Sequence, residues 1–134
     1  MFNAGDSVFK NFLDITPDDV QNTLNVVAAA FAYSRSAILA FKENDIEEAN
    51  GTRGTLIFTG ATASLRGGVF TSAFSAGKHG LRALNQSLAK EFGKENIHVA
   101  HVSFLQATLF SCRIVLTLNT NSPSLTEVRH GLLC

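Results

Sequence analysis

Two short apolar runs, separated by a segment of helical length, constrain the fold of this chain more than any other feature. TLIFT at residues 55–59 and IHVAHV at residues 97–102 are rich in strand-forming residues and predict two buried strands. Between them, residues 72–92 place apolar side chains on one helical stripe: Phe74, Leu81, Leu84, Leu88 and Phe92. A strand, a helix and a strand in this order predict parallel pairing through a right-handed crossover. The predicted fold class is therefore α/β.

A second long helix is predicted before the first strand. Thr16 can cap it, Pro17 suits its first position, and Asp18 and Asp19 favour the positive end of the helix dipole. Apolar residues recur at helical spacing as far as about Phe41. They form two faces, one with Val20, Leu24, Val27, Phe31 and Ile38, the other with Val26, Ala30, Tyr33, Ala37 and Phe41. A helix that is apolar on two sides needs two neighbours.

Composition and charge exclude several classes of protein. The 134 residues, 46% of them hydrophobic, predict one compact globular domain. Eleven basic and eleven acidic residues cancel, so no nucleic-acid or anionic-membrane partner is indicated. Cys112 and Cys134 are the only thiols, which favours a reducing compartment. The first residues lack a signal-peptide pattern, and Gln106 and Arg113 interrupt the most apolar segment, so the sequence favours a cytoplasmic protein without a membrane span.

The stretch FTGATASLRGG, residues 58–68, resembles a phosphate-binding loop only in its first glycine. A dinucleotide loop needs glycines at fixed spacing after the strand, whereas six other residues separate Gly60 from Gly67. No metal site is predicted either. His98 and His101 are three apart on a strand, so they face opposite sides and cannot readily bind one ion.

Four ordered matches identify a family resemblance. Phe74 and Lys78 are four apart and share one face of the helix 72–92, an aromatic-x-x-x-Lys pattern after a strand and a loop. This resembles the short-chain dehydrogenase/reductase family, whose signature is Tyr-x-x-x-Lys with a Ser in the preceding loop. Asn3, Ala4 and Gly5 resemble the Asn-Ala-Gly motif at the end of the family's fourth strand, and Asn25 falls at its catalytic Asn. Residues 75–102 resemble its active-site helix and next strand.

The resemblance implies a partial Rossmann-like fold over residues 1–102, the C-terminal portion of a doubly wound parallel sheet. Residues 103–134 do not match the family and are expected to form a divergent tail. The N-terminal nucleotide-binding half, with its Gly-rich TGxxxGxG loop, has no counterpart in this sequence. The stretch at residues 58–68 then corresponds to the family's catalytic-serine loop.

The resemblance also implies a chemistry that this sequence only partly retains. In the family, Tyr transfers a proton to or from the substrate oxygen, Lys lowers the pKa of that Tyr and holds the nicotinamide ribose, Ser binds the substrate oxygen, and Asn fixes a water. Here Phe74 stands at the Tyr position and Ala61 at the Ser position, so Asn25 and Lys78 remain as the catalytic residues. Thr62 or Ser64 offers a hydroxyl displaced by one or three positions.

The implied activity is NAD- or NADP-dependent interconversion of a carbonyl and an alcohol, with Asn3, Ala4, Gly5 and Lys78 on the cofactor side. Because the proton donor and the Gly-rich loop are missing, we expect this chain to be catalytically silent and not to bind the cofactor. The alternative is a non-catalytic interaction module, a homodimer through the helices 17–41 and 72–92.

Overall fold

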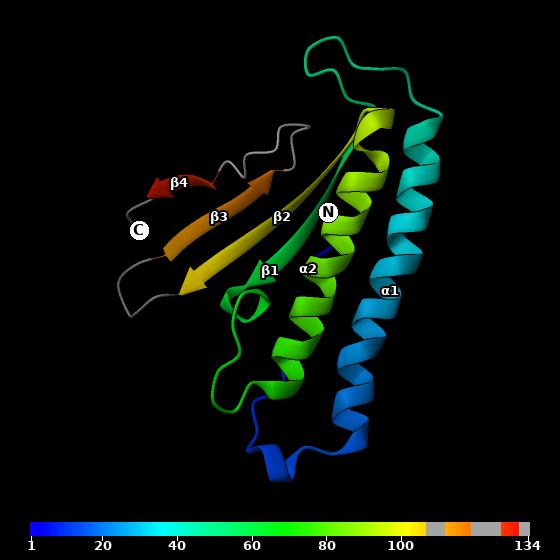
Figure 1. Cartoon of the computed structure of the whole chain (residues 1–134). Helices are drawn as coiled ribbons and strands as arrows, with labels where there is room; N and C mark the ends of the chain where they lie inside the picture. The colour runs from blue at the N-terminus through cyan, green and yellow to red at the C-terminus, as the bar shows by residue number, and fades with distance from the viewer. Residues whose placement is uncertain (107–111, 119–126, 132–134) are drawn as a thin grey trace.

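The fold is two long helices packed side by side on a four-stranded sheet (Figure 1). The computed structural model describes residues 1–106, 112–118 and 127–131. In chain order the helices and strands are η1 (Phe12–Asp14), α1 (Pro17–Lys42), β1 (Gly54–Ala61), η2 (Thr62–Ser64), α2 (Ser72–Phe92), η3 (Gly93–Glu95), β2 (Ile97–Gln106), β3 (Cys112–Leu118) and β4 (Glu127–Gly131). Both predicted helices and both predicted strands are confirmed, with the strands longer than expected.

The sheet has the strand order β1-β2-β3-β4. Strands β1 and β2 pair in parallel, from Gly54 opposite Ile97 to Ala61 opposite Phe104, as the crossover through α2 requires. Strands β3 and β4 then add in antiparallel orientation. The sheet therefore has two strands beyond the two that the sequence predicted, because the apolar, β-branched run at 112–118 pairs with the free edge of β2. The predicted domain boundary at residue 102 falls inside β2.

The N-terminal segment occupies the other edge of β1. Phe2 forms a parallel bridge with Phe58: its backbone N–H donates to the carbonyl of Ile57 at 2.7 Å, and its carbonyl accepts from Thr59 at 3.1 Å. The Phe2 side chain is buried, and its ring lies 5.6 Å from that of Tyr33. The first residues are thereby held beside the carboxyl-terminal half of β1.

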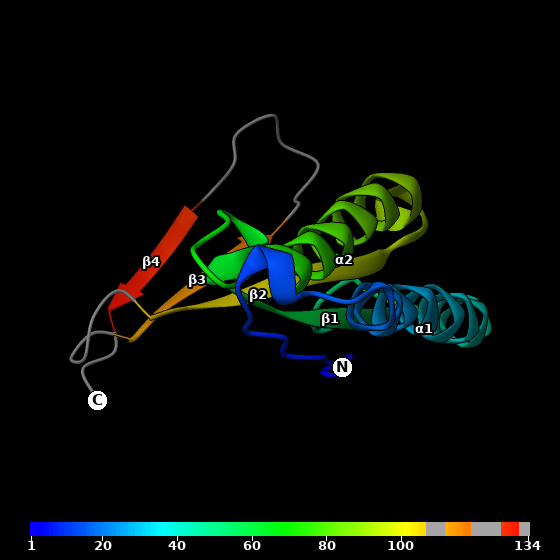
Figure 2. The ribbon, with the colours of Figure 1, turned by 90° about the horizontal axis from the view of Figure 1, so that it is seen from below.

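The core lies between α2 and the sheet. Figure 2 shows α2 over one face of β1 and β2, with α1 beside it at the β1 edge, while β3 and β4 extend beyond both helices. Gly54 sits under the ring of Phe41 and has no room for a Cβ atom, so the end of α1 closes over the start of β1. The buried apolar cluster consists of Phe2, Ala30, Ile38, Leu56, Phe58, Leu81, Leu84, Ala89, Ile97 and Val99.

Helix α1 begins as its sequence predicts. Thr16 accepts a hydrogen bond from the backbone of Asp19 at 3.2 Å, and the Asp19 carboxylate accepts one from the backbone of Thr16 at 2.9 Å, a complete capping box with Pro17 in the first turn. The Asp19 carboxylate also pairs with Lys10 at 2.7 Å. These contacts tie the N-terminal segment to the start of the helix.

Of the two predicted apolar faces of α1, the second packs on the core through Val26, Ala30, Ala37 and Phe41, whereas most of the first is exposed. The buried residues of α1 are Thr23, Ala30, Ser34 and Ile38, whereas Leu24, Phe31 and Leu39 are 47%, 58% and 49% exposed. Small residues face α2 because the two helices approach closely: a Cβ atom on Gly77 would overlap the Thr23 methyl group. Among the described residues, α1 is also the one helix long and apolar enough to cross a membrane, a test that core helices pass as well.

Candidate active site around Lys78

Lys78 lies at the centre of the residues that resemble the family's site. Its ammonium group donates to the carbonyl oxygen of Thr59, near the end of β1, at 3.1 Å. It also lies 5.9 Å from the centre of the Phe74 ring, one helical turn earlier on α2. The side chain is half-buried, and this burial lowers the pKa of Lys78 below the ordinary lysine value. The helix thus aims a partly desolvated amine at the carboxyl end of the parallel strands.

The N-terminal segment forms the opposite wall of this site. Gly5 lies so close that a Cβ atom there would be 3.6 Å from the Lys78 nitrogen, while Asn3 and Ala4 are exposed. The ring of Phe9 packs 5.4 Å from that of Phe74. A small cavity of about 10 Å³ lies between these segments and is lined by Gly5, Asp6, Thr23, Val26, Phe74, Gly77, Lys78 and Leu81. The structure therefore brings Gly5 and Lys78 together.

The hydroxyl groups that the family's chemistry needs are missing at this site. Phe74 carries none, and Ala61, the last residue of β1, carries only a methyl group. The Ser64 hydroxyl accepts from the backbone of Ala61 at 3.1 Å and is 1% exposed, so it supports the loop from behind. Thr62 is only partly exposed and has no described hydrogen bond from its side chain. Ser64 is therefore no substitute for the family's serine.

Asn25 lies apart from Lys78. It is exposed, and its side-chain oxygen accepts from Gln21 at 2.9 Å on the outer surface of α1. The residues of α1 that reach the cavity are Thr23 and Val26. Because successive residues turn by about 100° around a helix, Asn25 cannot share their direction. The small residues Thr23 and Ala30, seven positions apart on one side of the helix, were the signal that could have shown that Asn25 lies on another side.

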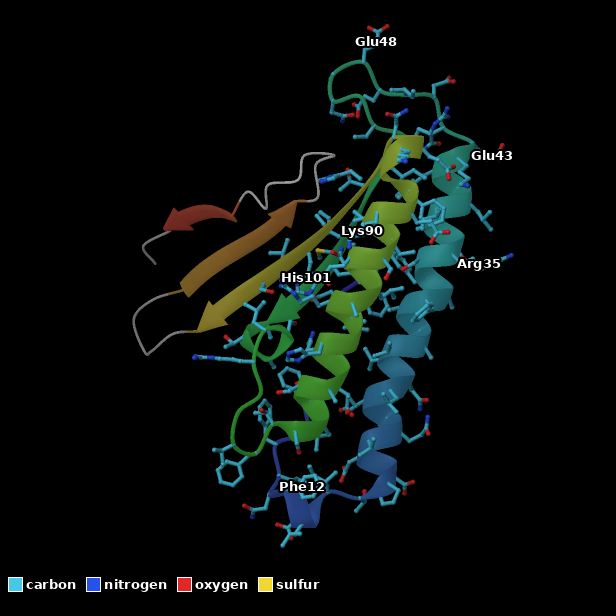
Figure 3. All side chains as sticks on the ribbon, in the orientation of Figure 1. Phe12, Arg35, Glu43, Glu48, Lys90 and His101 are labelled. Carbon is cyan, nitrogen blue, oxygen red and sulfur yellow. The ribbon has the colours of Figure 1, made fainter. Side chains whose placement is uncertain are left out.

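His101 was considered in the sequence only as a metal ligand, and its place in this region was not predicted. It lies on β2, where it is fully buried (Figure 3). Its ring lies against Gly60 of β1, where a Cβ atom would overlap it. One ring nitrogen is 3.1 Å from the hydroxyl of Ser103. Burial, with the charges of Arg82 and Lys78, lowers the pKa of His101 to about 4. The missing side chain of Gly60 therefore makes room for an imidazole and not for a phosphate. The parallel pairing of the two predicted strands was the signal that could have placed His101 beside Gly60.

Three buried side-chain nitrogens of the described residues have no hydrogen-bond partner. They are the Nε2 atom of His101, one guanidinium nitrogen of Arg82 and the amide nitrogen of Asn85. His98 is partly exposed while His101 is buried, as their spacing on the strand predicted. Over residues 1–106, 112–118 and 127–131 no cluster of three His, Cys, Asp or Glu side chains could hold a metal ion.

The comparison with protein families gives one match. The family model described as short chain dehydrogenase matches residues 1–105. That range ends within β2, so it contains both helices, β1 and the Lys78 site. No curated protein matches the sequence.

Solved structures of similar fold support the same assignment. A short-chain dehydrogenase from Rhodopseudomonas palustris is 41% identical, with a TM-score of 0.63 over 75% of this chain and 45% of that one. A 4-hydroxyisoleucine dehydrogenase complexed with NADH and succinate is 26% identical, with a TM-score of 0.64 over 75% and 41%. A putative short chain dehydrogenase from Escherichia coli CFT073, complexed with NADPH, shares the fold at 20% identity and a TM-score of 0.65, over 77% and 40%. This chain thus corresponds to less than half the length of each of them.

Proposed function

Because this chain belongs to the short-chain dehydrogenase family, we propose that it is an oxidoreductase-type unit that retains the cofactor-side lysine but does not catalyse carbonyl reduction. The observation that carries the proposal is the absence of a hydroxyl at both Phe74 and Ala61. A positioned general acid typically contributes a factor of about 10² to 10⁴ to the rate. Loss of an oxyanion donor costs about 2.7–4 kcal/mol of transition-state stabilisation.

The residues present fit one part of a nicotinamide cofactor. Lys78 points an amine into the cavity beside Gly5, and Gly5 leaves the approach to that amine free of a side chain. Lys78 and the backbone of Asn3, Ala4 and Gly5 would hold the ribose of NAD or NADP, consistent with the cofactors named for two of the similar structures. The cofactor, when bound, would supply or accept a hydride. In this chain Phe74 would border that position and exclude water, without a proton to donate.

Binding of the cofactor by these 134 residues alone is not expected. A pyrophosphate is normally held by a Gly-rich loop at a helix N-terminus, and the sequence contains no TGxxxGxG pattern. Titration of the chain followed by nicotinamide fluorescence should therefore show no saturation with NADH or NADPH. A double variant, Ala61→Ser with Phe74→Tyr, restores both hydroxyls. It should still reduce no carbonyl compound, because the Gly-rich loop remains absent. Micromolar saturation, or turnover by this variant, would show that the chain holds the cofactor after all. Carbonyl reduction by the unmodified chain would overturn the proposal itself.

A second candidate function is association into a homodimer through α1 and α2. The observation that favours it is an open groove of about 270 Å³ between the outer sides of the two helices, lined by Phe31, Ser34, Arg35, Ile38, Leu39, Lys42, Leu84, Leu88, Glu91 and Phe92. Exposed apolar side chains beside a charged rim are typical of surfaces that bind a partner. Arg35, which Figure 3 shows pointing away from the body of the molecule, and Glu91 provide opposite charges that a two-fold axis could pair.

Light scattering should detect two chains per particle at tens of micromolar. Leu24→Glu places a charge on the exposed face of α1 and should yield monomers, whereas Val69→Glu, in a loop outside the groove, should leave the dimer intact. A monomeric wild-type chain would rule the dimer out, and partition of that monomer into neutral lipid vesicles would assign α1 to a membrane instead.

A further inference from the structure

Asn50 is the one asparagine of the chain that is followed by glycine. The pair lies in the connection between α1 and β1, at the end of the molecule where Figure 3 labels Glu48. Asn50 and Gly51 are both exposed. Gly51 has a φ of +67°, a conformation that glycine adopts readily, and a Cβ atom there would meet nothing within 4 Å. Water therefore reaches this pair, and no side chain crowds the Gly51 nitrogen.

Two hydrogen bonds hold the side-chain carbonyl of Asn50. Its Oδ1 atom accepts from the backbone N–H of Thr52 at 2.9 Å and from the Thr52 hydroxyl at 2.8 Å. The side-chain amide nitrogen donates to the Glu47 carboxylate. Donors aimed at a carbonyl oxygen stabilise the negative charge that develops there when a nucleophile attacks the carbonyl carbon. The turn thus activates the side-chain amide of Asn50 towards attack.

The backbone nitrogen of Gly51 is a nucleophile within reach of this carbonyl. Attack on the Asn50 side chain closes a five-membered ring, so the two reacting groups are held close by the covalent chain itself. The Gly51 N–H donates to the carbonyl of Glu47 at 2.8 Å, and this bond has to open before the nitrogen attacks. It lies in an exposed turn that one bridge, between Glu47 and Thr52, closes. Exposed turns of this kind open locally at little cost in free energy.

We propose that Asn50 is a site of spontaneous covalent modification, at which the Gly51 nitrogen displaces the side-chain amide. That nitrogen bonds to the side-chain carbonyl carbon, the bond from this carbon to Nδ2 breaks, and Nδ2 leaves as ammonia with the proton of the Gly51 amide. Water then opens the ring and gives aspartate or isoaspartate. One water is consumed, one ammonia is released and no electrons are transferred. No residue of the Lys78 site takes part, so this proposal and the proposed function can fail separately.

The modification changes the charge of the turn. It places a carboxylate where the Asn50 amide donates to Glu47, beside the exposed Glu48. Because like charges repel, the bridge between Glu47 and Thr52 is weakened. Asn50→Asp carries the charge of the product. In this variant the backbone N–H of Glu47, which donates to Thr52 at 2.9 Å, should exchange its hydrogen faster than in the unmodified chain. An unchanged exchange rate would contradict this weakening.

The test of the reaction compares asparagines within one protein. The folded chain is incubated for days in mildly alkaline buffer, and the conversion of each asparagine is quantified by peptide mass spectrometry. Asn25 is the internal reference, because it is exposed and is followed by Val26, whose N–H is bonded within α1. Asn50 should convert at least about tenfold faster than Asn25, since its neighbouring nitrogen can reach the side chain. Conversion of Asn50 at the rate of Asn25 or below would overturn the proposal.

A matched pair of variants tests the activation by Thr52. Thr52→Val removes the hydroxyl that binds Oδ1 and should slow the conversion of Asn50 by about threefold to tenfold, the contribution of one neutral hydrogen bond. Thr52→Ser keeps the hydroxyl and should keep the rate. Circular dichroism on both variants checks that the fold is retained. In an isolated peptide of residues 47–53 the same two changes should give equal rates, because the hydrogen bond depends on the folded turn. Equal rates for the two variants of the folded chain, or the same difference in the peptide, would overturn the proposal.

Discussion

Helices α1 and α2 lie side by side and are similar in length, yet they differ in how many of their large apolar side chains are buried. Helix α2 lies over β1 and β2 and buries large side chains, Leu81 and Leu84 among them. Helix α1 contacts the rest of the described structure on one side, and that side carries Thr23, Ala30 and Ser34. Of its large apolar residues, Ile38 and Phe41 pack on the core, whereas Leu24, Phe31 and Leu39 are exposed. The comparison shows that the available neighbours, and not hydrophobicity alone, decide which face of a helix is buried.

The reason lies in the distance between the two helices. Gly77 of α2 faces Thr23 of α1 with no room for a Cβ atom, and Gly80 packs against Val27 one turn further along. Such close approach selects small residues on both sides, and the Thr23 and Ser34 hydroxyls are satisfied by carbonyl groups one turn earlier in their own helix. The outer face of α1 is free of this constraint and belongs to the surface through which we propose that the chain dimerises.

The largest expected effect contrasts two leucines. Leu81→Ala on α2 removes a side chain that is 1% exposed and should lower the free energy of unfolding by about 2–5 kcal/mol. Leu24→Ala on α1 should change the free energy of unfolding of the monomer by no more than about 0.5 kcal/mol. Urea denaturation at protein concentrations where the chain is monomeric measures both. Equal losses would mean that α1 is as fully packed as α2.

A smaller effect is expected at the contact between the helices. Gly77→Ala forces its new methyl group against Thr23 and should cost about 1–3 kcal/mol, offset in part by a helix-propensity gain of about 1 kcal/mol. Gly80→Ala is the control, because its Cβ atom would lie 3.3 Å from a Val27 methyl group that can adjust. Thr23→Ala should rescue Gly77→Ala in the double variant. If both glycine variants are equally stable by thermal unfolding, the helices are not in close contact at Gly77.

The next prediction concerns the pH dependence of stability, to which His101 under α2 and Asp19 at the start of α1 contribute in different pH ranges. Because the folded-state pKa of His101 is about 4, against 6.5 unfolded, the unfolded chain binds more protons between these values. Stability should be constant above pH about 6.5 and fall as the pH decreases towards about 4. His101→Gln should flatten this part of the profile. Titration of the His101 ring followed by NMR provides a second readout, and an ordinary pKa there would contradict the burial.

The smallest expected effect concerns the first turn of α1. The hydrogen bond from Lys10, followed by those from Thr16, lowers the pKa of Asp19 to about 2 from 3.8, so its contribution is present above pH about 4 and is lost as the pH falls towards 2. Asp19→Asn should remove this acid-dependent loss, whereas Asp18→Asn in the same turn should keep it. Thr16→Ala should cost about 1 kcal/mol at neutral pH. An unchanged acid profile in Asp19→Asn would show that the ion pair is broken in solution.

Much of the local structure followed from the sequence. The Thr16 cap, the two helices and the parallel pair of strands are set by contacts between residues close in sequence or by one crossover, and all were predicted. The family resemblance located Lys78 and Phe74 and brought Gly5 to the same site, because short motifs keep their spacing on a fixed backbone. The roles assigned to these residues, and to Asn25, remain predictions.

Features that depend on distant contacts could not be read from the sequence. The periodicity of α1 allowed either of two apolar faces, and only the packing on α2 and β1 selected the face with Ala30 and Phe41, which also turns Asn25 away from Lys78. The burial of His101 against Gly60 follows from the β1–β2 register, and the addition of β3 to β2 from a free strand edge. The sequence determined which elements form, since their signals are local. Tertiary structure decided which faces meet, because that depends on the space that each element leaves for its neighbour.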